Sequence, residues 1–122
     1  MEEWKLDFEW LQVRHLIKDR FNRAVLPDLN SILYLIGIQE ANLNRKSFTK
    51  EEKQDLMHVA TCHLLTMKGY YEFLGNDDDG WPHFNQIRIL PYEGVAEQEN
   101  FLKECVVEYF ETYKDLINEH EE

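Results

Sequence analysis

Residues 49–69, TKEEKQDLMHVATCHLLTMKG, carry the clearest local structural signal in the chain. Thr49 and Glu52 have the spacing of a capping box, in which the side chain of each residue accepts a hydrogen bond from the backbone N–H of the other at a helix start. Lys68 and Gly69 provide the cation and the left-handed residue that commonly end a helix. Between these ends, apolar residues recur every three or four positions: Leu56, Val59, Ala60, Leu64 and Met67. We therefore predict a helix with one buried face.

Upstream, residues 28–41 combine a helix-capping Asp28 with a segment that is apolar on nearly every side. A buried strand is the competing interpretation, and the length of the segment favours a helix. Gly37 within it is expected to mark a close crossing with a neighbouring element. Pro27 separates this helix from an earlier one.

The earlier helix is predicted over residues 3–24, which contain neither Gly nor Pro. Its apolar positions 6, 10, 13, 17 and 21 lie on one helical face. A second stripe lies well away from that face and consists of Trp4, Phe8, Leu11 and His15. Either the same chain wraps around this helix or a second subunit covers the extra stripe.

Downstream, residues 70–91 lose the helical period. Two short extended arms about the acidic turn Asp77-Asp78-Asp79-Gly80 would form a β-hairpin, because Asp and Gly suit tight turns. An irregular loop is the alternative. Aromatic and imidazole rings are dense here, so we expect them either to anchor the insert or to form a recognition surface. The candidate residues of that recognition surface are Asp77, Asp78, Asp79, Trp81 and His83.

A last amphipathic helix is predicted from about Val95 to the acidic C-terminal residues. The fold expected is all-α: a single domain over residues 1–122, forming a bundle of about four helices with a short aromatic and acidic insert. At 122 residues and 43% hydrophobic content, the chain can close one core.

The charge and hydropathy of the chain exclude several classes of partner. Thirteen basic and 24 acidic residues give a formal charge of −11, which repels nucleic acid and anionic lipid. No apolar run is long enough to cross a membrane, and the first residues are acidic where a secretory signal is basic. We therefore expect a cytoplasmic protein whose cysteines, Cys62 and Cys105, remain thiols.

One set of side chains has the spacing of metal ligands. Asp55, His58 and Cys62 share a face of the predicted third helix. A further ligand would have to come from another helix, for example from His15, Glu40 or Glu108. The alternative is an exposed Asp and His beside a half-buried thiol. The neighbouring His63 is expected to be a core histidine hydrogen-bonded to another side chain.

No glycine-rich phosphate loop and no Gly-x-Ser-x-Gly motif is present in the sequence. We therefore expect an interaction protein without catalytic activity and without a cofactor, which self-associates as a homodimer through Trp4, Phe8, Leu11 and His15. The alternative is a helical bundle that binds a divalent metal or a small ligand through His58 and Cys62, or through the insert from Asp77 to His83.

Overall fold

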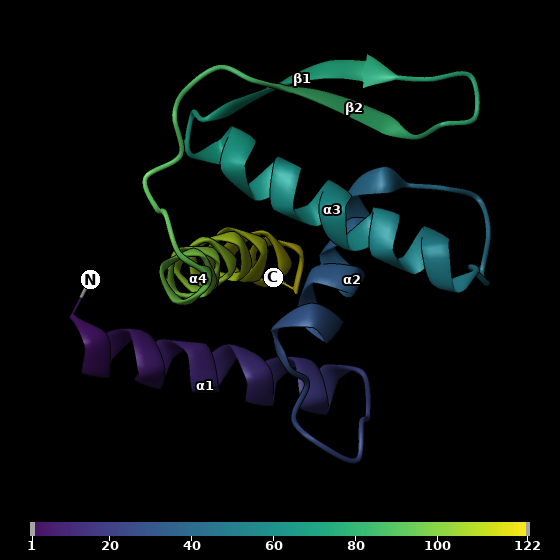
Figure 1. The fold of residues 1–122 in the computed structure, drawn as a ribbon. Helices are drawn as coiled ribbons and strands as arrows, with labels where there is room; N and C mark the ends of the chain where they lie inside the picture. The colour runs from purple at the N-terminus through teal and green to yellow at the C-terminus, as the bar shows by residue number, and fades with distance from the viewer. Residues whose placement is uncertain (1, 122) are drawn as a thin grey trace. The chain divides into compact units, whose positions relative to one another are not determined.

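A computed structural model describes residues 2–121 of the chain, with side chains described for residues 2–112. This part of the chain is mostly helical, as predicted, and a two-stranded antiparallel hairpin lies between the third and fourth helices (Figure 1). The elements, in chain order, are α1 (Glu3–Arg20), α2 (Leu29–Ala41), α3 (Lys50–Met67), β1 (Tyr71–Asn76), β2 (Pro82–Gln86) and α4 (Val95–Glu121).

The chain divides into two compact units. The first unit contains α1 and α4 and is made of Met1–Pro27 and Tyr92–Glu122. The second unit, Asp28–Pro91, contains α2, α3 and the hairpin. The arrangement of all four helices in one bundle therefore stays a prediction, whereas the number of helices and the position of the hairpin are as expected.

In the first unit, α1 buries the face that its spacing predicts, with Leu6, Trp10, Val13 and Ile17 all buried. The helix ends at Arg20, earlier than the predicted residue 24. The backbone of Asn22 turns left-handed, with φ of 52°, so that Phe21 falls outside the helix and is exposed. On α4, the buried residues include Leu102, Cys105, Val106 and Val107.

In the second unit, α2 and α3 cross closely at Gly37, as predicted. A Cβ atom at this position would overlap the carbonyl oxygen of Leu56 and lie 2.6 Å from its carbonyl carbon. Only a residue without a side chain therefore allows this contact. Beside the crossing, Ala41, Leu56 and Val59 form a buried cluster.

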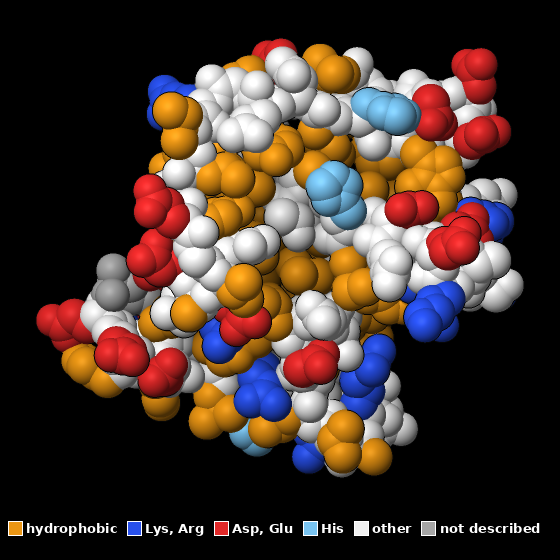
Figure 2. All heavy atoms as spheres, in the orientation of Figure 1, with side chains coloured by type: hydrophobic (Ala, Val, Ile, Leu, Met, Phe, Trp, Pro, Cys, Tyr) orange, Lys and Arg blue, Asp and Glu red, His pale blue; other side chains and the backbone are white. Residues whose placement is uncertain are grey.

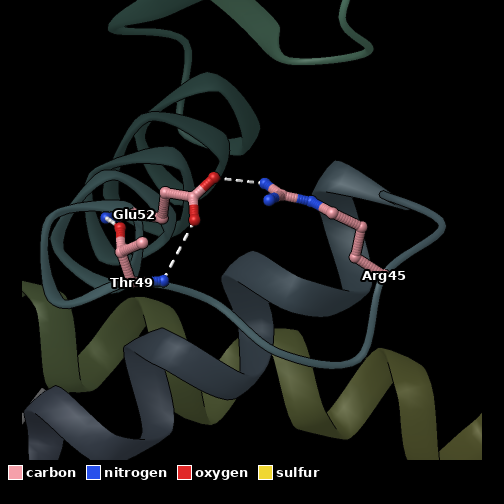
Figure 3. Close-up of polar contacts among 3 residues, drawn as sticks. All are labelled: Arg45, Thr49 and Glu52. Carbon is pink, nitrogen blue, oxygen red and sulfur yellow. Dashed lines mark hydrogen bonds and ion pairs between the residues drawn. The ribbon is translucent and has the colours of Figure 1, made fainter.

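The start of α3 is held by the predicted capping box and by one further residue (Figure 3). The Thr49 hydroxyl accepts a hydrogen bond from the Glu52 backbone N–H at 3.1 Å, and the Thr49 N–H donates to the Glu52 carboxylate at 3.0 Å. The second oxygen of that carboxylate pairs with the guanidinium of Arg45. Arg45 also stacks over the ring of Phe48, 5.0 Å from its centroid, which fastens the preceding loop to the helix.

The hairpin is the extended alternative proposed for the insert, with Phe73 paired across from Phe84. The Asp77 N–H donates to the Trp81 carbonyl at 2.9 Å and the Gly80 N–H to the Asp77 carbonyl at 3.0 Å. Gly80 has a φ of 92° and is therefore the left-handed residue that such a short hairpin loop needs. The register of β1 against β2 shifts between Phe73 and Gly75, where β1 has a bulge.

Candidate functional site

The face of α1 opposite its buried residues is apolar and open. Trp4, Phe8 and Leu11 are 68%, 58% and 42% exposed, and His15, which continues their line along the helix, is exposed as well. We call these four residues the α1 outer stripe. Single exposed apolar residues are common on proteins, but a continuous row of this size on one helix is typical of an interaction surface.

The outer stripe borders a groove between α1 and α4, within the first unit. The groove has a volume of about 540 Å³. From α1, Phe8, Leu11 and His15 line it, and α4 contributes Val107 and Phe110. The lining also includes the acidic and amide groups of Glu9, Gln12 and Glu111. Most of the side chains that line this groove are therefore apolar.

Polar contacts hold the ends of α1 beside the stripe. The Trp4 indole N–H donates to the Glu2 carboxylate at 2.6 Å, which keeps the ring on the surface of the first turn. Farther along, the Arg14 Nε donates to the Pro27 carbonyl at 2.8 Å and fixes the segment that follows the helix. These contacts leave the apolar faces of Trp4 and Phe8 open to solvent.

On α3, the structure brings together two of the three proposed metal ligands. The Cys62 Sγ lies 3.5 Å from the His58 Nε2, whereas Asp55 is exposed one turn earlier. Among the residues whose side chains the structure describes, no three His, Cys, Asp or Glu side chains are arranged to hold a metal ion. Burial also raises the pKa of the Cys62 thiol to about 11, so that the free thiol is protonated at neutral pH and is a poor nucleophile.

Of the further ligands considered for that set, only Glu40 belongs to the same unit as α3. Glu40 pairs with His63, whose Nε2 is 3.1 Å from the Glu40 Oε1. The hydrogen-bonding partner predicted for His63 is therefore present, although His63 is half-buried rather than in the core. His15 and Glu108 belong to the other unit.

In the insert, the acidic side chains gather at the turn end of the hairpin (Figure 2). Asp77 uses both carboxylate oxygens within the turn: one accepts from the N–H groups of Asp79 and Trp81 at 2.9 and 3.0 Å, and the other lies 2.9 Å from the His83 Nε2. The hydrogen bond with His83 holds the pKa of the Asp77 carboxyl below its usual value. Asp77 therefore stabilises the turn, and Asp78 and Asp79 are exposed.

The aromatic residues of the insert differ in how far they are buried. Trp81 and Phe84 are partly buried against the cluster of Ala41, Leu56 and Val59, and so anchor the hairpin on α2 and α3. Phe73 is exposed, with its ring centroid 5.6 Å from that of Phe84. The anchoring role is thus filled by Trp81 and Phe84.

Two structural contributions escaped the sequence analysis. Val107 forms part of the groove wall, and the adjacent pair Val106-Val107 is the signal that a second face of α4 is apolar. The second is Arg45, whose pairing with Glu52 depends on how the loop before α3 folds back.

None of the helices in residues 2–121 is long and apolar enough to span a bilayer. In comparisons with known proteins, no family model, no curated protein and no solved structure matches this chain.

Proposed function

We propose that this chain is an interaction protein without catalytic activity, which forms a homodimer through the α1 outer stripe. The observation that carries the proposal is the exposure of Trp4 and Phe8, two large aromatic side chains one helical turn apart. Tryptophan is also among the residues that contribute most to binding energy at interfaces. The neighbouring groove offers space for side chains of the second copy.

The size of the stripe supports a reversible dimer. Trp4 and Phe8 together leave roughly 280 Å² of aromatic surface exposed on each protomer, from their exposed fractions and the area of such side chains. At about 25 cal/mol per Å², covering this surface on both protomers releases on the order of 14 kcal/mol. Association itself costs about 4–15 kcal/mol, so that the dimer depends on each of the aromatic residues.

Light scattering coupled to size-exclusion chromatography tests this function. We expect the native chain to have the mass of a dimer at tens of micromolar and to dissociate on dilution. The double variant Trp4→Glu, Phe8→Glu is expected to be a monomer, because it places four charges in the interface. Circular dichroism should show that its helical content is unchanged, since both side chains are exposed.

Ile89→Glu provides the matched control. Ile89 is 91% exposed and lies outside the outer stripe, so this variant should dimerise like the native chain. A monomeric native chain at tens of micromolar, or an unchanged mass for the Trp4→Glu, Phe8→Glu variant, would contradict the proposed function.

A further inference from the structure

The charges of α1 are segregated along its length. Within the helix, residues 3–9 contain three acidic residues and one basic residue, whereas residues 14–20 contain three basic residues and one acidic residue. Each end of the helix therefore carries a net charge opposite to that of the other end. The helix dipole accounts for this order within one chain, because acids favour the N-terminus and bases the C-terminus. The same order also determines how two such helices can lie together.

The outer stripe has the three-and-four spacing of a coiled-coil seam. Trp4 and Leu11 occupy one core position of the repeat, and Phe8 and His15 occupy the other. Asp7 and Arg14 then lie at the same flanking position, one heptad apart. Asp7 is exposed and Arg14 is half-buried. The Arg14 contact with the Pro27 carbonyl uses one of its five N–H donors.

We infer that the two copies of the proposed homodimer pair their α1 helices antiparallel, about a two-fold axis level with residues 9 and 10. This inference rests on the proposed function. In this register, Phe8 packs against Leu11 of the partner subunit and Trp4 packs against His15 of the partner subunit. Asp7 then faces Arg14 of the partner subunit, and the symmetry repeats this ion pair on the other side. The acidic end of each helix lies along the basic end of the other.

A parallel pairing is disfavoured by the same charges. It would place the acidic ends side by side and the basic ends side by side, and it would align the two helix dipoles. Lys18, which continues the seam after Leu11 and His15, would face its own copy directly. In that arrangement Asp7 would face Gln12 of the partner subunit, and Arg14 would face Asp19 of the partner subunit.

Charge exchange distinguishes the two orientations. We expect Asp7→Arg alone and Arg14→Asp alone each to raise the dimer dissociation constant about tenfold, because each creates two like-charge contacts in place of two ion pairs. The double variant Asp7→Arg, Arg14→Asp should restore dimerisation, since the pairs are then re-formed with exchanged partners. In a parallel dimer, Asp7→Arg would have little effect and the double variant would stay weakened.

A distance measurement provides a second test that does not depend on Arg14. A spin label on Arg20→Cys reports the separation of the two copies of residue 20, and both native cysteines are buried and therefore protected from the label. At a rise of 1.5 Å per residue, the antiparallel register predicts about 32 Å between the label sites, against about 10 Å for parallel helices. A dimer with a label separation of about 10 Å, whose affinity the variant Asp7→Arg, Arg14→Asp does not restore, would overturn the antiparallel register and leave the proposed dimer intact. A chain that is monomeric throughout would overturn both.

Discussion

Gly37→Ala is the substitution that most directly tests the crossing of α2 and α3. The added methyl group would overlap the carbonyl oxygen of Leu56 and lie 2.6 Å from its carbonyl carbon, where ordinary contact begins near 3.4 Å. The obstacle is main chain, so that no change of side-chain rotamer relieves it. The two helices must therefore separate by about 1 Å, which forfeits a quarter to a half of the dispersion energy of the atoms in contact.

Two effects of opposite sign determine how much Gly37→Ala changes the free energy of unfolding. Overpacking of this kind costs about 3 kcal/mol, the upper part of the usual range, because the contact is with rigid backbone. Alanine is favoured over glycine within a helix by about 1 kcal/mol. We therefore expect the free energy of unfolding to fall by about 2 kcal/mol, which is a factor of roughly 30 in the ratio of unfolded to folded chain.

Urea denaturation of the full chain measures this difference. Circular dichroism and tryptophan fluorescence should be followed together, because agreement between them supports a single transition. The expected result is a lower midpoint with an unchanged slope against urea concentration. The main chain around position 37 remains helical in this prediction, with the loss confined to packing against Leu56.

The exposed Gln39 on the same helix supplies the control. Comparing Gln39→Ala with Gln39→Gly measures helix propensity alone, and alanine should be the more stable by about 1 kcal/mol. At position 37, we expect the opposite order, with glycine more stable than alanine. If Gly37→Ala is as stable as the native chain, or more stable, the close approach of the helices at Leu56 is wrong.

Three further predictions follow from contacts described above. Thr49→Ala removes the cap of α3 and should lower the free energy of unfolding by about 1 kcal/mol, whereas Thr49→Ser should preserve it, as measured by urea denaturation. In a Cys105→Ala background, Cys62 should react with iodoacetamide at pH 8 about 100-fold more slowly than an ordinary thiol, because its pKa near 11 leaves few thiolates; equal rates in the folded and urea-unfolded protein would contradict this. His83→Ala should raise the pKa of the Asp77 carboxyl toward its ordinary value, as followed by NMR. Since the pKa of Asp77 is lowered in the folded chain, its stabilising effect is present above the unfolded pKa and is lost as the pH falls through the folded value; an Asp77 titration unmoved in the variant would refute the assignment.

The local elements were predictable because their signals lie in neighbouring residues. The capping box at Thr49 and Glu52 and the left-handed Gly69 fixed the ends of α3, and the structure confirms both. The crossing at Gly37 was predictable from a glycine inside an apolar helix. Phe21 was predicted wrongly as part of the buried face, because the left-handed turn at Asn22 ends the helix before the period of the sequence does.

The site was predictable only in part, since one wall of the groove comes from distant sequence. The outer stripe of α1 follows from helical geometry alone, but the opposing wall at Val107 and Phe110 requires knowing that α4 packs on α1. The spacing of Asp55, His58 and Cys62 was a weaker guide, because residues on one helical face need not converge. In the structure the Cys62 thiol is buried, whereas the Asp55 carboxylate is exposed to solvent, so the two side chains lie in different environments.

The first unit joins helices from opposite ends of the chain, and this order has a consequence for its synthesis. The second unit is continuous in sequence and can fold as it leaves the ribosome. The buried face of α1 has to wait until translation reaches the middle of α4, some 90 residues later, on the order of 5–20 s at ordinary rates. Throughout that interval Leu6 and Ile17 are as accessible as Phe8. Newly made α1 therefore offers both of its apolar faces to chaperones, or to a neighbouring nascent copy, during that interval.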